Sequence, residues 1–237
     1  MNRTFGLPTQ STRRGGRSAS PWFWRHWTLL AALTVLPALT AEAQPKTPVG
    51  QVTIGLGGLA GFPAGDDFGT GMGVNAWFAF RVTSFLLLEL NASWTTGTVE
   101  SRPTRFSGGR YRLIPVQAGL RLGRSLGDRT FAYAAGGGAY TVHRITVDES
   151  LRATWEGLGF EIREEVDPVL RPYVGLGGLY RFTRHFLLSL DARLVIGGGT
   201  VGRWTLRDRT TQTAASGNIP DVSTGGFTLR GGFAYTF

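Results

Sequence analysis

Cysteine is absent from the 237 residues of this chain. Without thiols the chain forms no disulfide, has no thiolate metal ligand and has no cysteine nucleophile. Charged residues are scarce as well, at 17%, compared with about 25% in an average soluble domain. After the first 43 residues no segment is apolar over the roughly eighteen residues that a membrane helix needs. If the remaining chain spans a membrane, it must therefore do so as a closed β-barrel.

The net charge of +9 raises the question of a nucleic-acid partner. Five arginines and one glutamate lie within residues 1–43, so this segment carries +4 and the rest of the chain carries +5. No run of lysines or arginines follows Lys46. The sequence therefore predicts no polyanion-binding patch and no nucleic-acid partner.

The N-terminal residues have the three parts of a secretory signal. A basic segment is followed by fourteen apolar residues over 28–41, and Ala41-Glu-Ala43 has the small-x-small pattern of a cleavage site. Fourteen residues are too few to cross about 30 Å of hydrocarbon as a helix. The prediction is a signal peptide over 1–43, cleavage between Ala43 and Gln44, and one mature domain over 44–237.

The mature sequence alternates between apolar and polar residues. In the third alternating segment Leu88 and Leu90 fall on one face, whereas Glu89 and Asn91 fall on the other. Successive side chains of a strand point to opposite faces, and segments of about ten alternating residues are typical of membrane barrels. The predicted strands are 50–62, 69–82, 85–98, 110–123, 130–145, 168–182, 186–201 and 224–237.

The connections between these segments argue against a soluble β-sandwich, which has the same periodicity. Their lengths are 6, 2, 11, 6, 22, 3 and 22 residues, so that long and short connections alternate. Membrane barrels have short periplasmic turns at one end and longer external loops at the other. We predict an all-β fold, a closed eight-stranded antiparallel transmembrane β-barrel with up-and-down meander topology and both termini in the periplasm.

Two stretches of the sequence repeat. The residues 80–92 (Phe-Arg-Val-Thr-Ser-Phe-Leu-Leu-Leu-Glu-Leu-Asn-Ala) resemble 180–192 (Tyr-Arg-Phe-Thr-Arg-His-Phe-Leu-Leu-Ser-Leu-Asp-Ala), and Gly55-Leu-Gly-Gly-Leu59 recurs at 175–179. These two glycine-rich segments lack the third glycine of dinucleotide-binding loops and the Gly-Lys-Ser/Thr sequence of phosphate-binding loops. They indicate close packing within strands, and the repeats indicate similar hairpins within one sheet.

The C-terminal Gly-Gly-Phe-Ala-Tyr-Thr-Phe237 resembles the assembly signal of Gram-negative outer-membrane proteins, with Phe233, Tyr235 and Phe237 as its alternating aromatic residues. Together with the strand sequences at 114–120 and 171–180, it makes the mature chain similar to the OmpA/OmpX-type superfamily of small barrels. The resemblance implies a monomer in outer-membrane lipid and lipopolysaccharide, assembled with periplasmic chaperones and the barrel assembly machinery. It implies no particular activity, because that superfamily includes adhesins, defence proteins, porters and lipid enzymes.

The polar face of each strand predicts what fills the lumen. An eight-stranded barrel is just wide enough inside for side chains to fill it. An unpaired buried charge costs several kcal/mol, so we expect a paired network containing Glu89–Arg121 and Asp191–Arg230, with Arg193 and Gln117 joining them. The alternative is that the same groups line a narrow aqueous channel. The predicted lumen residues are Arg81, Glu89, Asn91, Gln117, Arg121, Asp191, Arg193 and Arg230.

Histidine is the main test for an enzyme, because outer-membrane lipid enzymes of this superfamily pair a histidine with a serine. The mature chain holds only His143 and His185, and neither has the His-x-Ser spacing. We expect His185 in a tight turn and His143 as a solvated loop residue, despite the nearby acidic residues. The acidic connection 146–167 lacks a calcium-loop spacing and is expected to be a solvated loop.

These observations predict a non-enzymatic outer-membrane barrel with no catalytic residue, cofactor or metal. Its lumen is expected to be plugged by side chains, and its external loops to carry any recognition. A narrow pore or small-solute transporter is the alternative function, and a lipid-modifying enzyme is the third.

Overall fold

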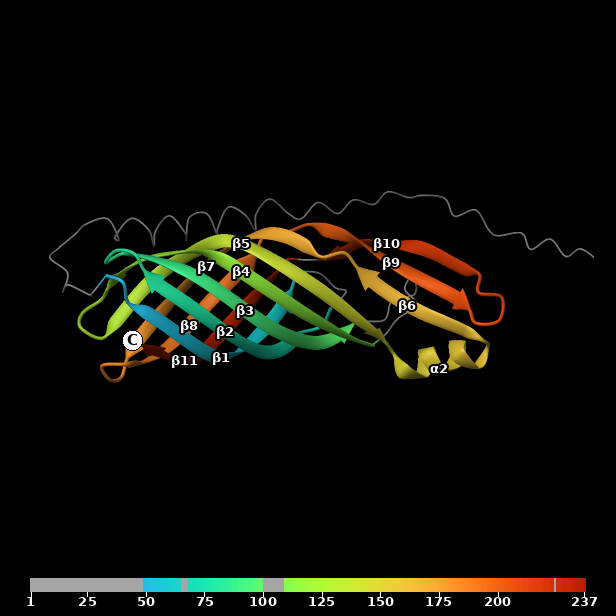
Figure 1. The fold of residues 1–237 in the computed structure, drawn as a ribbon, viewed down its shortest axis with the longest axis horizontal. Helices are drawn as coiled ribbons and strands as arrows, with labels where there is room; N and C mark the ends of the chain where they lie inside the picture. Colours follow the sequence, from blue (N-terminus) through green and yellow to red (C-terminus); the bar gives the residue numbers. More distant parts are fainter. Residues whose placement is uncertain (1–48, 65–67, 100–108, 224) are drawn as a thin grey trace, which may run out of the picture. The chain divides into compact units, whose positions relative to one another are not determined.

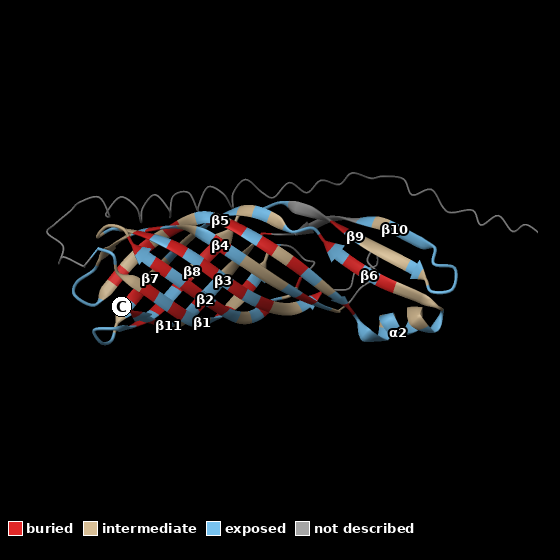
Figure 2. Ribbon diagram, viewed as in Figure 1, coloured by how far each residue is buried: buried red, intermediate tan, exposed pale blue. Residues whose placement is uncertain are grey.

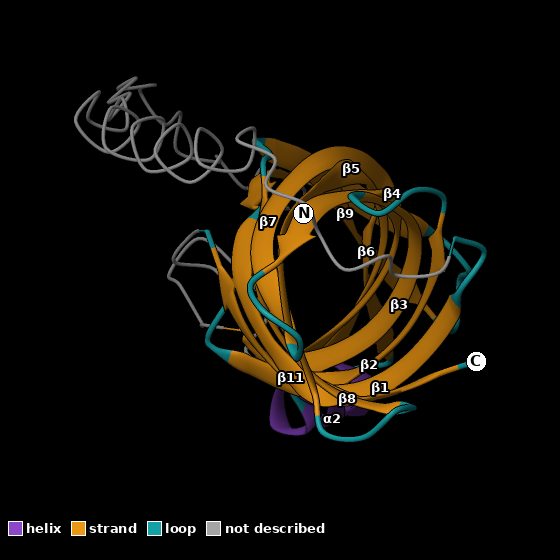
Figure 3. Cartoon of the chain, turned by 90° about the vertical axis from the view of Figure 1, so that its left-hand side faces the viewer, coloured by secondary structure: helices purple, strands orange, loops and turns teal. Residues whose placement is uncertain are grey.

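The structure is a computed structural model that describes residues 49–64, 68–99, 109–223 and 225–237. Eight strands form a closed antiparallel barrel in the ring order β1-β11-β8-β7-β5-β4-β3-β2 (Figures 1 and 3). The predicted signal peptide 1–43 and the cleavage residues Ala41, Ala43 and Gln44 lie outside the described residues. The barrel strands are β1 (Val52–Pro63), β2 (Gly71–Arg81), β3 (Leu86–Val99), β4 (Gly109–Ser125), β5 (Thr130–Val147), β7 (Val169–Arg181), β8 (Phe186–Val195) and β11 (Gly226–Thr236).

The closed eight-stranded antiparallel barrel predicted from the sequence is confirmed. Each predicted segment corresponds to one barrel strand. The largest difference is in the seventh segment, which was predicted to continue to residue 201 but leaves the barrel at Val195. The ring closes because β1 pairs with β11 from Thr53↔Thr236 to Pro63↔Gly226.

The two longest connections were predicted to be loops, and this was wrong. The first contains α2 (Glu149–Gly157) and β6 (Phe160–Val166), and the second contains β9 (Gly199–Asp208) and β10 (Ala214–Ser223). These strands form a separate sheet in the order β10-β9-β6. The sequence hides this sheet because β6 is rich in acidic residues and its partner β9 belongs to a different connection.

Local sequence explains the bounds of α2. The Asp148 carboxylate accepts a hydrogen bond from the Ser150 amide at 2.9 Å, which satisfies one of the free N–H groups of the first turn. Gly159 follows the helix with a φ of +86°, the left-handed conformation that commonly ends helices. No helix among the described residues is long and apolar enough to cross a membrane.

Burial alternates along every barrel strand (Figure 2). In β3, Glu89 is only 4% exposed, whereas its neighbour Leu90 is 52% exposed. Polar side chains thus face the lumen and apolar side chains face outward, the reverse of a water-soluble protein and the arrangement of a lipid-facing barrel.

The repeated sequences form two equivalent hairpins, β2–β3 and β7–β8. In the first turn the Val82 amide bonds to the Leu86 carbonyl at 2.9 Å, and in the second the Phe182 amide bonds to the Phe186 carbonyl at 3.0 Å. In the ring of eight strands β2 lies four places from β7, and β3 lies four places from β8. The two hairpins therefore stand on opposite walls, and equivalent inward residues face each other across the lumen.

Candidate functional site in the barrel lumen

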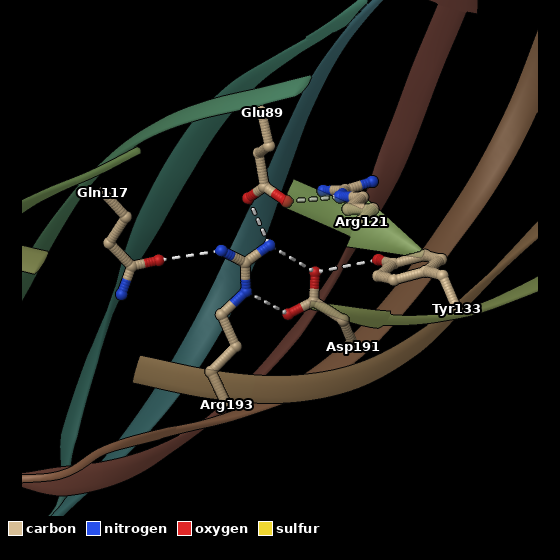
Figure 4. A network of polar contacts seen from close by, with 6 residues as sticks. All are labelled: Glu89, Gln117, Arg121, Tyr133, Asp191 and Arg193. Carbon is tan, nitrogen blue, oxygen red and sulfur yellow. Dashed lines mark hydrogen bonds and ion pairs between the residues drawn. The ribbon is translucent and has the colours of Figure 1, made fainter. Parts of the chain in front are cut away.

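A polar network crosses the middle of the barrel (Figure 4). Glu89 on β3 forms ion pairs with Arg121 on the adjacent β4 and with Arg193 on the opposite wall. Arg193 also donates to the Gln117 side-chain oxygen at 2.9 Å and contacts the Asp191 carboxylate at 3.2 Å. Because these contacts join opposite walls, side chains span the lumen at this level.

Aromatic rings complete the network. The Arg121 guanidinium lies over the rings of both Trp77 and Tyr133, at 4.4 Å and 4.5 Å from their centres. The Tyr133 hydroxyl donates to Asp191 at 3.2 Å, and Arg193 lies 5.2 Å from the Tyr173 ring. Cation–π contacts of this kind gain strength when they are desolvated.

Sequence reasoning missed the three aromatic residues Trp77, Tyr133 and Tyr173. Extending the inside–outside alternation to β2, β5 and β7 would have placed them in the lumen, because Trp77 shares the face of Arg81 on β2. Glycines on the neighbouring strands make room for the rings of Trp77 and Tyr133. A Cβ atom at Gly177 would lie 2.6 Å from the Tyr133 ring, and one at Gly55 would lie 2.3 Å from the Trp77 ring.

The structure places all eight predicted lumen residues inside the barrel, each at most 6% exposed. Three of the eight lie outside the central network, namely Arg81, Asn91 and Arg230. The others, which the structure brings together, are Glu89, Gln117, Arg121, Asp191 and Arg193.

The carboxylate of Asp191 contacts Arg193 and Tyr133 rather than its predicted partner Arg230. The ladder between β8 and β11 does place Asp191 opposite Arg230. However, Arg193 stands two residues along the same face of β8 and reaches both Asp191 and Glu89. Within the described part of the chain, Nε and Nη1 of Arg230 are buried without a hydrogen-bond partner.

The prediction of a solvated loop position for His143 was wrong. His143 lies within β5, is 7% exposed and pairs across the ladder with Leu113. Its Nδ1 has no hydrogen-bond partner among the described residues, so it does not form a Ser–His–acid relay through that atom. His185 does lie in the turn between β7 and β8. The described residues contain no group of three or more His, Asp or Glu side chains that could hold a metal ion.

The aromatic residues of the C-terminus lie on the outer surface. Phe233 and Phe237 are 66% and 69% exposed. The Tyr235 ring packs edge-on against Phe186 and Phe237, at 5.2 Å and 4.8 Å between ring centres. Tyr235 and Phe237 therefore form part of an aromatic cluster at the turn end of the barrel, on the face that points away from the lumen.

Comparison with known proteins identifies the fold. No protein-family model and no curated protein sequence matches the chain. The crystal structure of the outer membrane protein OprG from Pseudomonas aeruginosa is 13% identical, with a TM-score of 0.63, over 82% of this chain and 98% of that one. The NMR structure of the outer membrane protein AlkL is 15% identical, with a TM-score of 0.50, over 84% and 97% of the two chains. The chain therefore has the fold of small eight-stranded outer-membrane barrels, as the resemblance of the sequence predicted.

Replacing Asp191 with alanine is expected to lower the free energy of unfolding by about 3 kcal/mol, the lower end of the range for breaking a buried ion pair. The loss is limited because Arg193 keeps its contacts with Glu89 and Gln117. Urea titration in lipid vesicles, followed by tryptophan fluorescence, measures it. Arg230→Gln serves as the comparison: if it is as destabilising as Asp191→Ala and the two effects are not additive, Asp191 depends on Arg230 after all.

Outside the barrel, the stability of the turn between β9 and β10 is expected to decrease in strong acid. The Asp208 carboxylate accepts hydrogen bonds from the amides of Thr210 and Thr211 at 2.7 Å and 3.1 Å. These bonds lower the pKa of Asp208 below its ordinary value. A carboxyl group whose pKa is lowered by folding stabilises the fold at pH values above its ordinary pKa of about 3.9. This stability is lost as the pH falls through the pKa of the folded state.

The amides of Thr210 and Thr211 are therefore expected to exchange slowly at neutral pH and to lose protection only in strong acid. An NMR titration of the Asp208 carboxyl carbon, with amide exchange of the turn, measures both. Asp208→Asn keeps an oxygen acceptor without the titrating charge and should abolish the acid dependence. A carboxyl midpoint at or above the ordinary value would contradict the expectation.

Proposed function

We propose that this chain is an integral protein of the bacterial outer membrane without enzymatic activity, whose lumen is closed by side chains. The observation that carries the proposal is the ion pair of Glu89 with Arg193, which joins opposite walls within a network of buried groups. The outward apolar face supports the membrane location, since residues such as Leu56 and Leu190 are each 66% exposed.

The proposed role is recognition at the end of the barrel that carries the long connections. The connections containing α2, β6, β9 and β10 all leave the barrel at that end, opposite the short turns. We propose that this end faces the outside and that the termini face the periplasm. Lipopolysaccharide and outer-membrane lipid then surround the barrel, and the assembly machinery and periplasmic chaperones are its partners during biogenesis. We propose a monomer, because the barrel is closed within one chain.

Single-channel recording in planar bilayers tests the closed lumen. Refolded wild-type protein is expected to show conductance close to background, because a lumen closed by side chains has no continuous aqueous path. The double variant Glu89→Ala/Arg193→Ala removes the ion pair that connects the opposite walls, and its conductance should be higher than that of the wild type. Arg184→Gln, a change at an exposed turn position, is the matched control and should behave as wild type.

A narrow pore is the second candidate, and one observation favours it. Several inward polar atoms have no hydrogen-bond partner among the described residues, including both amide atoms of Asn91 and the Ser93 hydroxyl. Buried polar groups of this kind are usually satisfied by ordered water. Stepwise conductance well above background from wild-type protein would support the pore and reject the closed lumen.

A further inference from the structure

The short-turn end of the barrel contains a small pocket that the central network does not use. Its volume is about 30 Å³, enough for roughly two or three water molecules. Its charged lining groups are Arg81, Arg129 and Arg181, with Asp128 as the single acid. The lining therefore carries three positive charges and one negative charge, which favours an anionic ligand.

The repeated hairpins supply two of these arginines. Arg81 ends β2 and Arg181 ends β7, at equivalent positions of the repeated sequences. Because β2 and β7 stand on opposite walls, the two guanidinium groups approach the same mouth from opposite sides. Arg129 is held beside Arg181, since its carbonyl accepts the Arg181 amide at 2.7 Å.

Arg81 is buried in this pocket with too few hydrogen bonds to offset the cost of burying its guanidinium group. It is 6% exposed, and its Nη1 donates to the Ser84 carbonyl at 2.9 Å. Its guanidinium lies 4.8 Å from the centre of the Phe131 ring, while its Nε is buried without a hydrogen-bond partner among the described residues. Arg181 adds a repulsive positive charge. A buried cation in this position is costly unless an anion or further hydrogen bonds stabilise it.

We propose that the turn-side mouth binds one phosphate group, which Arg81 and Arg181 hold from opposite walls. Guanidinium groups bind phosphate oxygens through paired N–H donors, so Nε of Arg81 gains the acceptor that it lacks. The hydroxyls of Thr53 and Thr236 line the same pocket and are hydrogen-bonded to each other at 3.0 Å, so one of the two remains as a further donor. The phosphate comes either from free inorganic phosphate or from a phospholipid headgroup that reaches over the rim. The site does not depend on whether the lumen conducts.

The Nε–Hε signal of Arg81 in nitrogen–proton NMR spectra reports directly on this site, and its loss in Arg81→Gln assigns it. The full chain, refolded in a maltoside detergent that lacks phosphate, is titrated with inorganic phosphate at constant ionic strength, and with sodium chloride as the reference. We expect a saturable shift with phosphate alone. Arg181→Gln should weaken binding by about tenfold or more, the effect of losing roughly 1.4 kcal/mol. Arg184→Gln, which removes the same charge from the same turn end outside the pocket, should change it less than about twofold.

A second arm identifies the source of the phosphate. The same signal is recorded in phosphatidylglycerol nanodiscs without free phosphate, where a shift that added phosphate does not alter indicates a bound headgroup. The proposal is overturned if neither phosphate nor lipid shifts the signal saturably, if chloride acts equally, or if Arg184→Gln weakens binding as much as Arg181→Gln. Should Arg81→Gln fail to fold, Arg181→Gln and Arg129→Gln decide the result, because Arg181 is half-buried and Arg129 is exposed.

Discussion

Replacing Glu89 with alanine is expected to lower the free energy of unfolding by about 3–5 kcal/mol, the cost of breaking a buried ion pair by removing one partner. Glu89 is the central acceptor of the lumen, since its carboxylate contacts both Arg121 and Arg193 and its side chain is fully buried. Alanine leaves two guanidinium groups facing each other in the barrel interior. We therefore expect the larger end of the range, and a greater effect than for Asp191→Ala.

Urea titration in lipid vesicles, followed by the mobility of unheated protein on gels, measures this change. Glu89→Gln keeps the shape and one acceptor oxygen and should fall between wild type and alanine. Glu161→Ala is the matched control outside the barrel, because Glu161 forms an exposed ion pair with Arg163 at 2.7 Å and should matter little. Wild-type stability in Glu89→Ala would show that water reaches both arginines, and would favour the aqueous channel.

Deleting Phe237 is expected to reduce the amount of protein in the outer membrane by about tenfold or more, which corresponds to losing roughly 1.4 kcal/mol of recognition. The deletion should change the stability of refolded protein only slightly. The Phe237 side chain is 69% exposed, and its amide donates one hydrogen bond to the Val52 carbonyl at 3.0 Å. One such bond contributes about 1 kcal/mol. An effect on assembly that exceeds the effect on stability would support recognition of the terminal aromatic residue.

The amount of folded protein in outer-membrane fractions and the urea midpoint of refolded protein separate the two effects. Phe237→Tyr keeps a terminal ring and should assemble nearly normally. Phe85→Ala is the matched control, because Phe85 is also an exposed aromatic residue, at 54%, in a turn at the same end. The assembly-signal hypothesis fails if the deletion variant reaches the outer membrane at wild-type levels.

The sequence by itself determined which side chains face the lumen. A strand alternates with a period of two residues, so the apolar Leu88 and the polar Glu89 must point to opposite faces wherever β3 lies. The same local rule, with alternating short and long connections, was sufficient to predict the eight barrel strands and the outward aromatic residues at the C-terminus. The same alternation also placed Arg121 and Arg193 in the lumen, because each lies on the polar face of a strongly alternating segment.

The sequence also predicted the pair of Glu89 with Arg121 on neighbouring strands, which the structure confirms, but only the tertiary structure decided which side chains make contact across the lumen. Gln117 and Arg193 are 76 positions apart in the chain and touch because ring closure sets β4 and β8 across one lumen. The sheet of β6, β9 and β10 escaped prediction for the same reason, since its pairing joins two separate connections. Arg81 and Arg181 meet at one mouth only because their hairpins stand four strands apart in a ring of eight. Periodicity is local and can be read along the chain, whereas contacts across a lumen depend on strand order and on the reach of long side chains.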